Sequence, residues 1–166
     1  MALSGCTYQP YHYERYVIDN GDSGQSRIKD EISTFSINVS PTRYNSDLAK
    51  KPYKIYFKYV DSSMRLNELA ICNISISTDS GRKLYETDGC KSIDFEVPSL
   101  VEGAEPYAKS ASLAIENINP DFHAGERLIV MFSYGTNSTR PPVPVKLVFN
   151  PVLEKGKFQP CCLPSV

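Results

Sequence analysis

The sequence predicts an all-β protein, a single antiparallel β-sandwich of about eight strands, and three observations support this. Apolar residues alternate with polar residues through several segments of strand length, which is typical of half-buried strands. Turn-forming sequences containing Gly, Pro, Asn or Asp separate these segments. The composition, with 11 Tyr, 7 Phe, 12 Pro and 9 Gly, suits short strands joined by turns.

The length and charge of the chain limit its domain count and its class of partner. A chain of 166 residues suits one domain with short extensions. The formal net charge of −1 lacks the basic excess that is usual in nucleic-acid-binding domains, so we expect no nucleic-acid partner. The chain has five cysteines without Cys-x-x-Cys spacing and two histidines, which argues against a zinc site. We therefore expect no metal and no cofactor.

A short motif of known type lies near the start of the chain. Leu3, Ser4 and Gly5 precede Cys6. This motif resembles the lipobox of bacterial lipoproteins, in which small residues mark the cleavage site and the cysteine receives acyl chains. The resemblance implies lipidation of Cys6 and a longer start in the native gene. Because Thr7 rather than Asp follows, it also favours the periplasmic side of the outer membrane.

The chain divides into three parts by composition. Residues 1–30 predict an N-terminal tether, residues 31–150 the sandwich domain, and residues 151–166 a C-terminal tail with vicinal Cys161 and Cys162. These two cysteines could pair with others or stay exposed, and the sequence favours neither.

The polar run from Asp19 to Gly24 in the predicted tether indicates a turn. It also faintly resembles a calcium loop, with Asp19, Asp22 and Asp30 as oxygen donors. Gly21, however, stands where such a loop needs Asp or Asn, so we expect an ordinary turn.

Two clear strands open the sandwich domain, at Ile32–Val39 and Tyr53–Val60. In the second strand, alternation places Lys54, Tyr56 and Lys58 on the polar face. One interpretation is a surface that binds a sugar or an anionic polymer. The other is a solvated face whose lysines protect a strand edge against pairing.

Two turn signals predict a meander in the next segment. Asp79–Gly81 suits a three-residue hairpin loop, which would set Ile76 opposite Leu84. Asp88–Gly89 suits a two-residue hairpin, which would set Leu84 opposite Ile93. Both turns agree on one core face.

Cys72 and Cys90 fall near each other in this meander, which makes a disulfide plausible. Such a bond would contribute about 3 kcal/mol to stability. The alternative is two free thiols with Cys72 buried, and sequence does not give the Cβ directions that decide between them.

The second half of the domain contains three more predicted strands. Ala111–Ile115 alternates, Arg127–Gly135 is the longest apolar run, and Val143–Phe149 alternates with Pro144 inside it. Because Arg127–Gly135 is apolar on both faces, we expect a central strand covered on both sides. Pro144 fits an edge strand.

The order of strand, corner and long apolar strand resembles the E–F region of immunoglobulin-like sandwiches. The tyrosine corner and the Cys-Trp-Cys set of that family are missing. The resemblance therefore implies only an immunoglobulin-like or prealbumin-like architecture.

The corner contains the main candidate for chemistry, His123, which lies near Asp121 and Glu126. One His with two acids is a weak signal, and His12 lies far off in the predicted tether. We expect a solvated corner rather than a metal or acid–base site. No Gly-x-Ser-x-Gly, phosphate-binding or His-Glu-x-x-His motif is present, so no enzyme is expected.

Two functions follow from these sequence features. The first is a non-enzymatic exported lipoprotein that engages another cell-envelope protein or is structural, with the lipid anchor at Cys6 as its only membrane contact. The alternative is a carbohydrate- or polymer-binding module that uses Lys54, Tyr56 and Lys58.

Overall fold

The computed structural model describes residues 9–19, 25–29, 33–43, 50–97, 107–137 and 142–158. All regular secondary structure within these ranges is β-strand. The ten strands are β1 (Gln9–Ile18), β2 (Gln25–Lys29), β3 (Ser33–Arg43), β4 (Lys50–Asp61), β5 (Glu68–Thr78), β6 (Lys83–Glu86), β7 (Cys90–Asp94), β8 (Lys109–Ile118), β9 (Leu128–Thr136) and β10 (Val143–Phe158).

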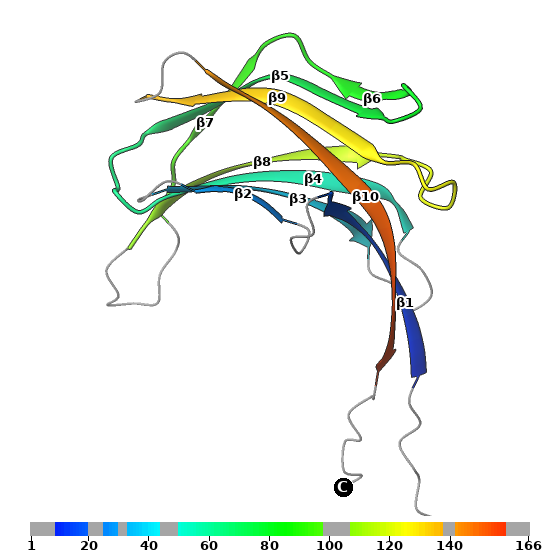
Figure 1. The fold of residues 1–166 in the computed structure, drawn as a ribbon. Coiled ribbons are helices and arrows are strands. Elements are labelled where there is room, and N and C mark those ends of the chain that lie inside the picture. The colour runs from blue at the N-terminus through cyan, green and yellow to red at the C-terminus, as the bar shows by residue number, and fades with distance from the viewer. Residues whose placement is uncertain are drawn as a thin grey trace, which may run out of the picture.

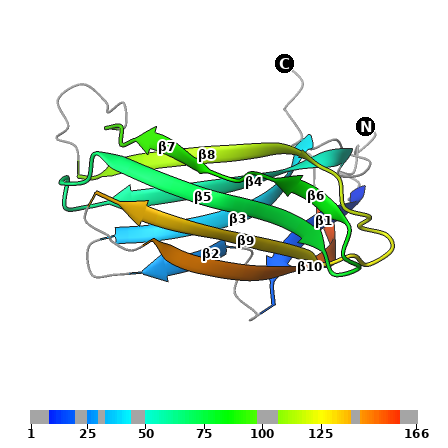
Figure 2. The same ribbon diagram turned by 90° about the horizontal axis from the view of Figure 1, so that it is seen from above.

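The strands form two antiparallel sheets that face each other. The first sheet has the order β1-β10-β9-β5-β6, with β7 also paired to β5, and the second has the order β2-β3-β4-β8. Figures 1 and 2 show these sheets as two layers. The predicted antiparallel β-sandwich is confirmed. It has more strands than the predicted eight because β1 and β2 lie in the segment predicted as a tether.

The core lies between the two layers and is rich in aromatic rings. Phe35 and Phe57 come from the second sheet, and Phe132 and Tyr134 come from the first. The Phe57 and Phe132 ring centroids are 5.1 Å apart, and those of Phe35 and Tyr134 are 4.7 Å apart. These edge and tilted contacts join the sheets, because each ring stands on the inward face of its strand.

Strand β9 is central in the first sheet, as predicted, but its outer face is not covered. Leu128, Val130 and Phe132 point inward and are buried. On the other face, Ile129 is half-buried and Met131 is 41% exposed. The prediction of cover on both sides is therefore wrong, since the sandwich has only two layers within the described residues.

Strands β1 and β10 form a long two-stranded ribbon that crosses the predicted domain boundaries. Gln9 pairs with Phe158 at one end and Ile18 with Phe149 at the other. Tyr16 and Ile18 are buried in the core. The sheets therefore include residues 9–18 and 151–158, which differs from the predicted tether and tail. Strand β1 was not predicted at this length, because tyrosines and polar residues are mixed in its sequence and the alternation of apolar and polar residues is weak.

Pro144 lies on a half of β10 that has one described neighbour. Val143 to Phe149 pairs with β9, whereas β1 begins to pair only at Phe149. A proline lacks the N–H that a second neighbour would need, so its place at this edge follows from its chemistry.

The predicted hairpin at Asp88–Gly89 is wrong. Strands β6 and β7 do not pair with each other; both pair with β5, so Leu69 rather than Leu84 lies opposite Ile93. The segment that joins β6 to β7 also bonds to β5. The Thr87 amide donates to the Ile74 carbonyl, and the Asn73 amide donates to the Gly89 carbonyl, both at 2.9 Å.

The hairpin at Asp79–Gly81 forms, and Gly81 adopts the expected left-handed conformation with φ 86°. A bulge beyond it sets Ile76 opposite Tyr85 instead of Leu84. The bulge shifts the pairing by one residue, which turn chemistry alone does not predict.

The turn between β4 and β5 is organised by one buried carboxylate, Asp61. Its oxygens accept hydrogen bonds from the Ser63 amide at 2.9 Å, the Ser63 hydroxyl at 2.5 Å and the Leu66 amide at 2.9 Å. Burial alone would raise the pKa of Asp61, but these hydrogen bonds outweigh burial and lower it.

We expect Asp61→Ala to lower the free energy of unfolding by about 2 kcal/mol at pH 7, because two backbone amides lose their acceptor. The lowered pKa means that this stabilisation is present above the unfolded pKa of about 3.9 and is lost as pH falls through the folded pKa. Urea unfolding at pH 7 and below pH 4 measures both effects. Asp61→Asn, which keeps one acceptor, should lose less, and equal stability of all three proteins would contradict this explanation.

Candidate functional site

The three residues singled out on β4 share the outer face of the second sheet. Tyr53, Ile55, Phe57 and Tyr59 point into the core, so Lys54, Tyr56 and Lys58 point outward. Tyr56 is 41% exposed. Strand β4 lies between β3 and β8, so the lysines do not protect an edge, and that part of the second interpretation is wrong. Its other part, a solvated face, agrees with the exposure of Tyr56 and Lys58.

Cross-strand pairing surrounds Tyr56 and Lys58 with small polar groups. Asn38 lies directly opposite Tyr56 on β3, and Lys58 lies between Ser36 on β3 and Ser112 on β8. Together these positions form a hollow of about 340 Å³, which we call the Tyr56 hollow. It is lined by Ser36, Asn38, Tyr56, Phe57, Lys58, Ser110 and Ser112.

Alternation in the sequence predicted the β4 side of this hollow and left the β3 and β8 sides unrecognised. Alternation does place Ser36 and Asn38 on a polar face of their strand, which is the available signal. Which residues they meet depends on register, which the sequence leaves open.

The two lysines on this face differ in their electrostatic surroundings. The Lys54 ammonium lies 2.5 Å from Glu116 Oε1, and this hydrogen bond raises the pKa of Lys54. Lys58, four residues further along β4, has no ion pair with any residue that the structure describes. Within the described residues, the positive charge beside Tyr56 is therefore uncompensated, whereas the charge of Lys54 is neutralised locally.

The Tyr56 hollow contains groups suited to binding. Its serine hydroxyls donate and accept hydrogen bonds, Asn38 does both through its amide, and the Tyr56 ring offers an apolar surface with a polar tip. None of the described residues that line it has a carboxylate or an imidazole for acid–base catalysis. The arrangement suits a ligand with many hydroxyl groups and a partly apolar face.

His123 lies beside a different carboxylate from those predicted. Its Nε2 atom is 3.3 Å from Oε1 of Glu14, a residue of β1 that is 2% exposed. The segment predicted as a tether therefore passes this corner, as strand β1. His12 precedes Glu14 by two residues in β1, and its side chain lies outside the described atoms.

The acids near His123 hold the corner together. Glu126 accepts hydrogen bonds from the Arg82 guanidinium at 2.5 Å and the Asp121 amide at 2.6 Å. The bond from Arg82 lowers the pKa of Glu126. Tyr16 donates to the Glu126 carbonyl at 3.1 Å, and burial raises the pKa of its phenol. These contacts give the corner a structural role.

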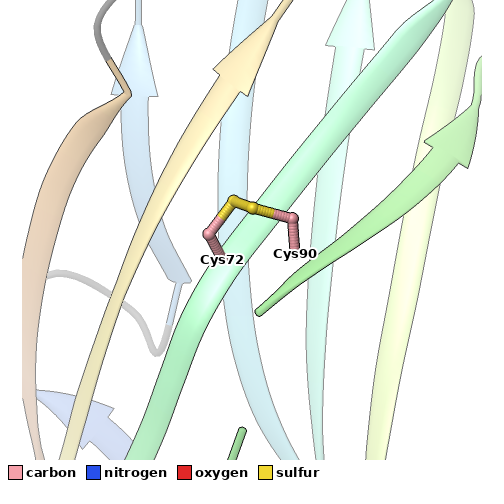
Figure 3. The surroundings of a disulfide bond; sticks show 2 residues. All are labelled: Cys72 and Cys90. Atoms are coloured by element: carbon pink, nitrogen blue, oxygen red, sulfur yellow. A yellow bond between two sulfur atoms is a disulfide. The ribbon is translucent and has the colours of Figure 1, made fainter. Parts of the chain in front are cut away.

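Cys72 and Cys90 are joined by a disulfide between β5 and β7 (Figure 3). They lie directly opposite each other in the ladder. A bulge explains why Cys72 points away from the core: the β5–β9 register shifts between Cys72 and Ser75, and Asn73 has φ 52°. Ile71 and Ile74 on either side are consequently both buried.

The other predicted cysteine positions, Cys6, Cys161 and Cys162, lie outside the described residues, as do Asp22 and Asp30 of the possible calcium loop. Within the described ranges, no three His, Cys, Asp or Glu residues come close enough to hold a metal ion. No described helix is long and apolar enough to cross a membrane.

Comparisons with known proteins do not assign a family. No protein-family description matches the chain. No curated protein matches its sequence. A solved structure, Northeast Structural Genomics Consortium target SoR45, is similar at a TM-score of 0.27 with 7% sequence identity, over 88% of this chain and 84% of that one. A likeness at this score carries no argument about function.

Proposed function

We propose that this chain is a non-enzymatic, exported binding module that is anchored to the cell envelope through Cys6 and binds carbohydrate in the Tyr56 hollow. The observation that carries the proposal is the hollow itself, where an exposed tyrosine ring lies among serine and asparagine side chains. A pyranose has an apolar C–H face and a rim of hydroxyls. The ring of Tyr56 can pack against the C–H face, and the serine and asparagine groups can hydrogen-bond with the hydroxyls.

The shape of the molecule is consistent with an anchor at the start of the chain. The ribbon of β1 and β10 extends beyond the two layers (Figure 1), and it ends at the pair Gln9 and Phe158. Cys6 precedes Gln9 by three residues. The ribbon would then be the spacer that separates the sandwich from the bilayer, the role that the sequence assigned to the predicted tether.

Cys6→Ser in the full native gene product should move the protein from the membrane fraction to the soluble fraction without a change in unfolding midpoint. Several acyl chains, each worth about 0.8 kcal/mol per buried CH₂, would otherwise hold it at the membrane. Fractionation with detergent extraction measures this. Cys161→Ser is the matched control and should stay with the membrane. Retention of Cys6→Ser there would refute the anchor.

A second candidate function is attachment to another envelope protein, and one observation favours it. The outer face of the first sheet has a hollow of about 470 Å³ beside the half of β10 that has one described neighbour. Its lining includes Met131, Val145 and Lys146. Exposed apolar side chains beside a strand edge are common at protein contacts.

A glycan array and a pull-down from envelope extract, both with the purified protein, separate the two functions. Retention of a polysaccharide on the array supports the carbohydrate proposal. Capture of a stoichiometric protein partner together with an array that shows no binding would replace it with the protein-binding function.

A further inference from the structure

The described part of the outer face of the second sheet carries charges of both signs. On β4 it presents Lys54 and Lys58. Two described acids lie beside these lysines: Glu116 on β8, and Glu96, which bridges to Ser110.

The positive charge that lines the Tyr56 hollow belongs to Lys58. Glu116 neutralises Lys54, whereas Lys58 has no ion pair among the described residues. Ser36 and Ser112 flank Lys58 on the neighbouring strands. The Ser36 hydroxyl already donates to the Lys58 carbonyl at 3.3 Å. A carboxylate oxygen would therefore meet one charged donor, the Lys58 ammonium, and one neutral donor, the Ser112 hydroxyl.

We infer that the ligand of the Tyr56 hollow is an acidic polysaccharide, with a pyranose ring against Tyr56 and its carboxylate at Lys58. This inference rests on the proposed carbohydrate-binding function and adds the charge of the sugar to it. Charge complementarity selects the acidic polymer, because a neutral sugar would leave the Lys58 ammonium unused. A single-stranded nucleic acid also combines stacking with negative charge, but proteins that bind it usually have a basic excess, which this chain lacks.

Binding of polygalacturonate and alginate, each beside its carboxyl-reduced neutral form, tests the inference by affinity gel electrophoresis. We expect at least one acidic polymer to bind roughly tenfold more tightly than its reduced form, with affinity falling at high salt. Lys58→Gln should lose about tenfold in affinity for that polymer. Lys146→Gln makes the same charge change on the opposite sheet and should stay within about twofold.

The outcomes distinguish this inference from the proposed function. Equal binding of acidic and reduced polymers, or unchanged affinity of Lys58→Gln, would overturn the inference and leave carbohydrate binding intact. Absence of binding to either polymer pair overturns the inference, and a blank glycan array in addition overturns the proposed function. Tighter binding of single-stranded DNA than of any polysaccharide would overturn both and assign the face to nucleic acid.

Discussion

Replacing Phe57 with alanine is expected to lower the free energy of unfolding by about 4 kcal/mol. Its ring is fully buried and touches both Phe35 on the neighbouring strand and Phe132 on the opposite sheet. Truncation removes these contacts and leaves a cavity between two packed layers that cannot collapse freely. Urea unfolding followed by circular dichroism measures the loss.

Tyr56→Ala on the same strand is the matched control for Phe57→Ala. Because the Tyr56 ring is exposed on the outer face, its removal should cost about 0.5 kcal/mol or less. A similar loss of stability in both variants would mean that β4 is not oriented as described. The assignment of Phe57 to the core and Tyr56 to the outer face would then be wrong, and the Tyr56 hollow would not exist as described.

Tyr56→Ala should also weaken carbohydrate binding by about 2 kcal/mol, which corresponds to roughly 30-fold in Kd. The reason is loss of the ring that packs against the sugar, in a hollow whose other groups contribute weaker hydrogen bonds. Isothermal titration calorimetry with the glycan retained on the array measures the change.

Tyr56→Phe separates the ring from its hydroxyl. It keeps the apolar surface, so its affinity should stay within about threefold of the natural protein, since one neutral hydrogen bond contributes about 1 kcal/mol or less. A loss as large as that of Tyr56→Ala would show that the hydroxyl binds the sugar and that the ring does not. Full affinity in Tyr56→Ala would remove Tyr56 from the site.

The fold could be predicted where one face of a strand is apolar and the other polar. Phe35, Ile37 and Val39 alternate with polar residues, as do Tyr53, Ile55 and Phe57 on the next strand, and both sets are buried as expected. Period-two alternation reports burial on one face directly, without knowledge of the neighbouring strands. The continuous apolar run of β9 located that strand without alternation, although its outer face proved open.

The prediction failed where pairing, not burial, decides the structure. The sequence Asp88–Gly89 is a strong hairpin signal, yet β7 continues along β5 beside β6. The turn sequence favours pairing of β6 with β7, but the long strand β5 offers hydrogen-bond partners to both of them. Pairing with β5 is what forms. The β1–β10 ribbon was missed for a related reason, since its paired residues are 149 positions apart at the tip, where Gln9 lies opposite Phe158, and 131 apart at the other end.

The candidate site was half predictable for the same physical reason. Alternation placed Lys54, Tyr56 and Lys58 on one face, and no sequence pattern linked them to Ser36 or Ser112, which come from other strands. Only the register of three strands brings those groups together. The pairing of Lys54 with Glu116, which distinguishes Lys54 from Lys58, likewise depends on a contact across 62 positions in the chain.

The proposed function depends above all on the outer face of the second sheet being the binding surface, and chemical-shift mapping examines that face residue by residue. The ¹⁵N-labelled protein would be titrated with the glycan identified on the array while amide signals are followed. We expect the perturbed amides to cluster at residues 36–38, 56–58 and 110–112. Perturbations that cluster instead around Met131, Ser133 and Lys146, on the outer face of the first sheet, would rule out the Tyr56 hollow as the binding site.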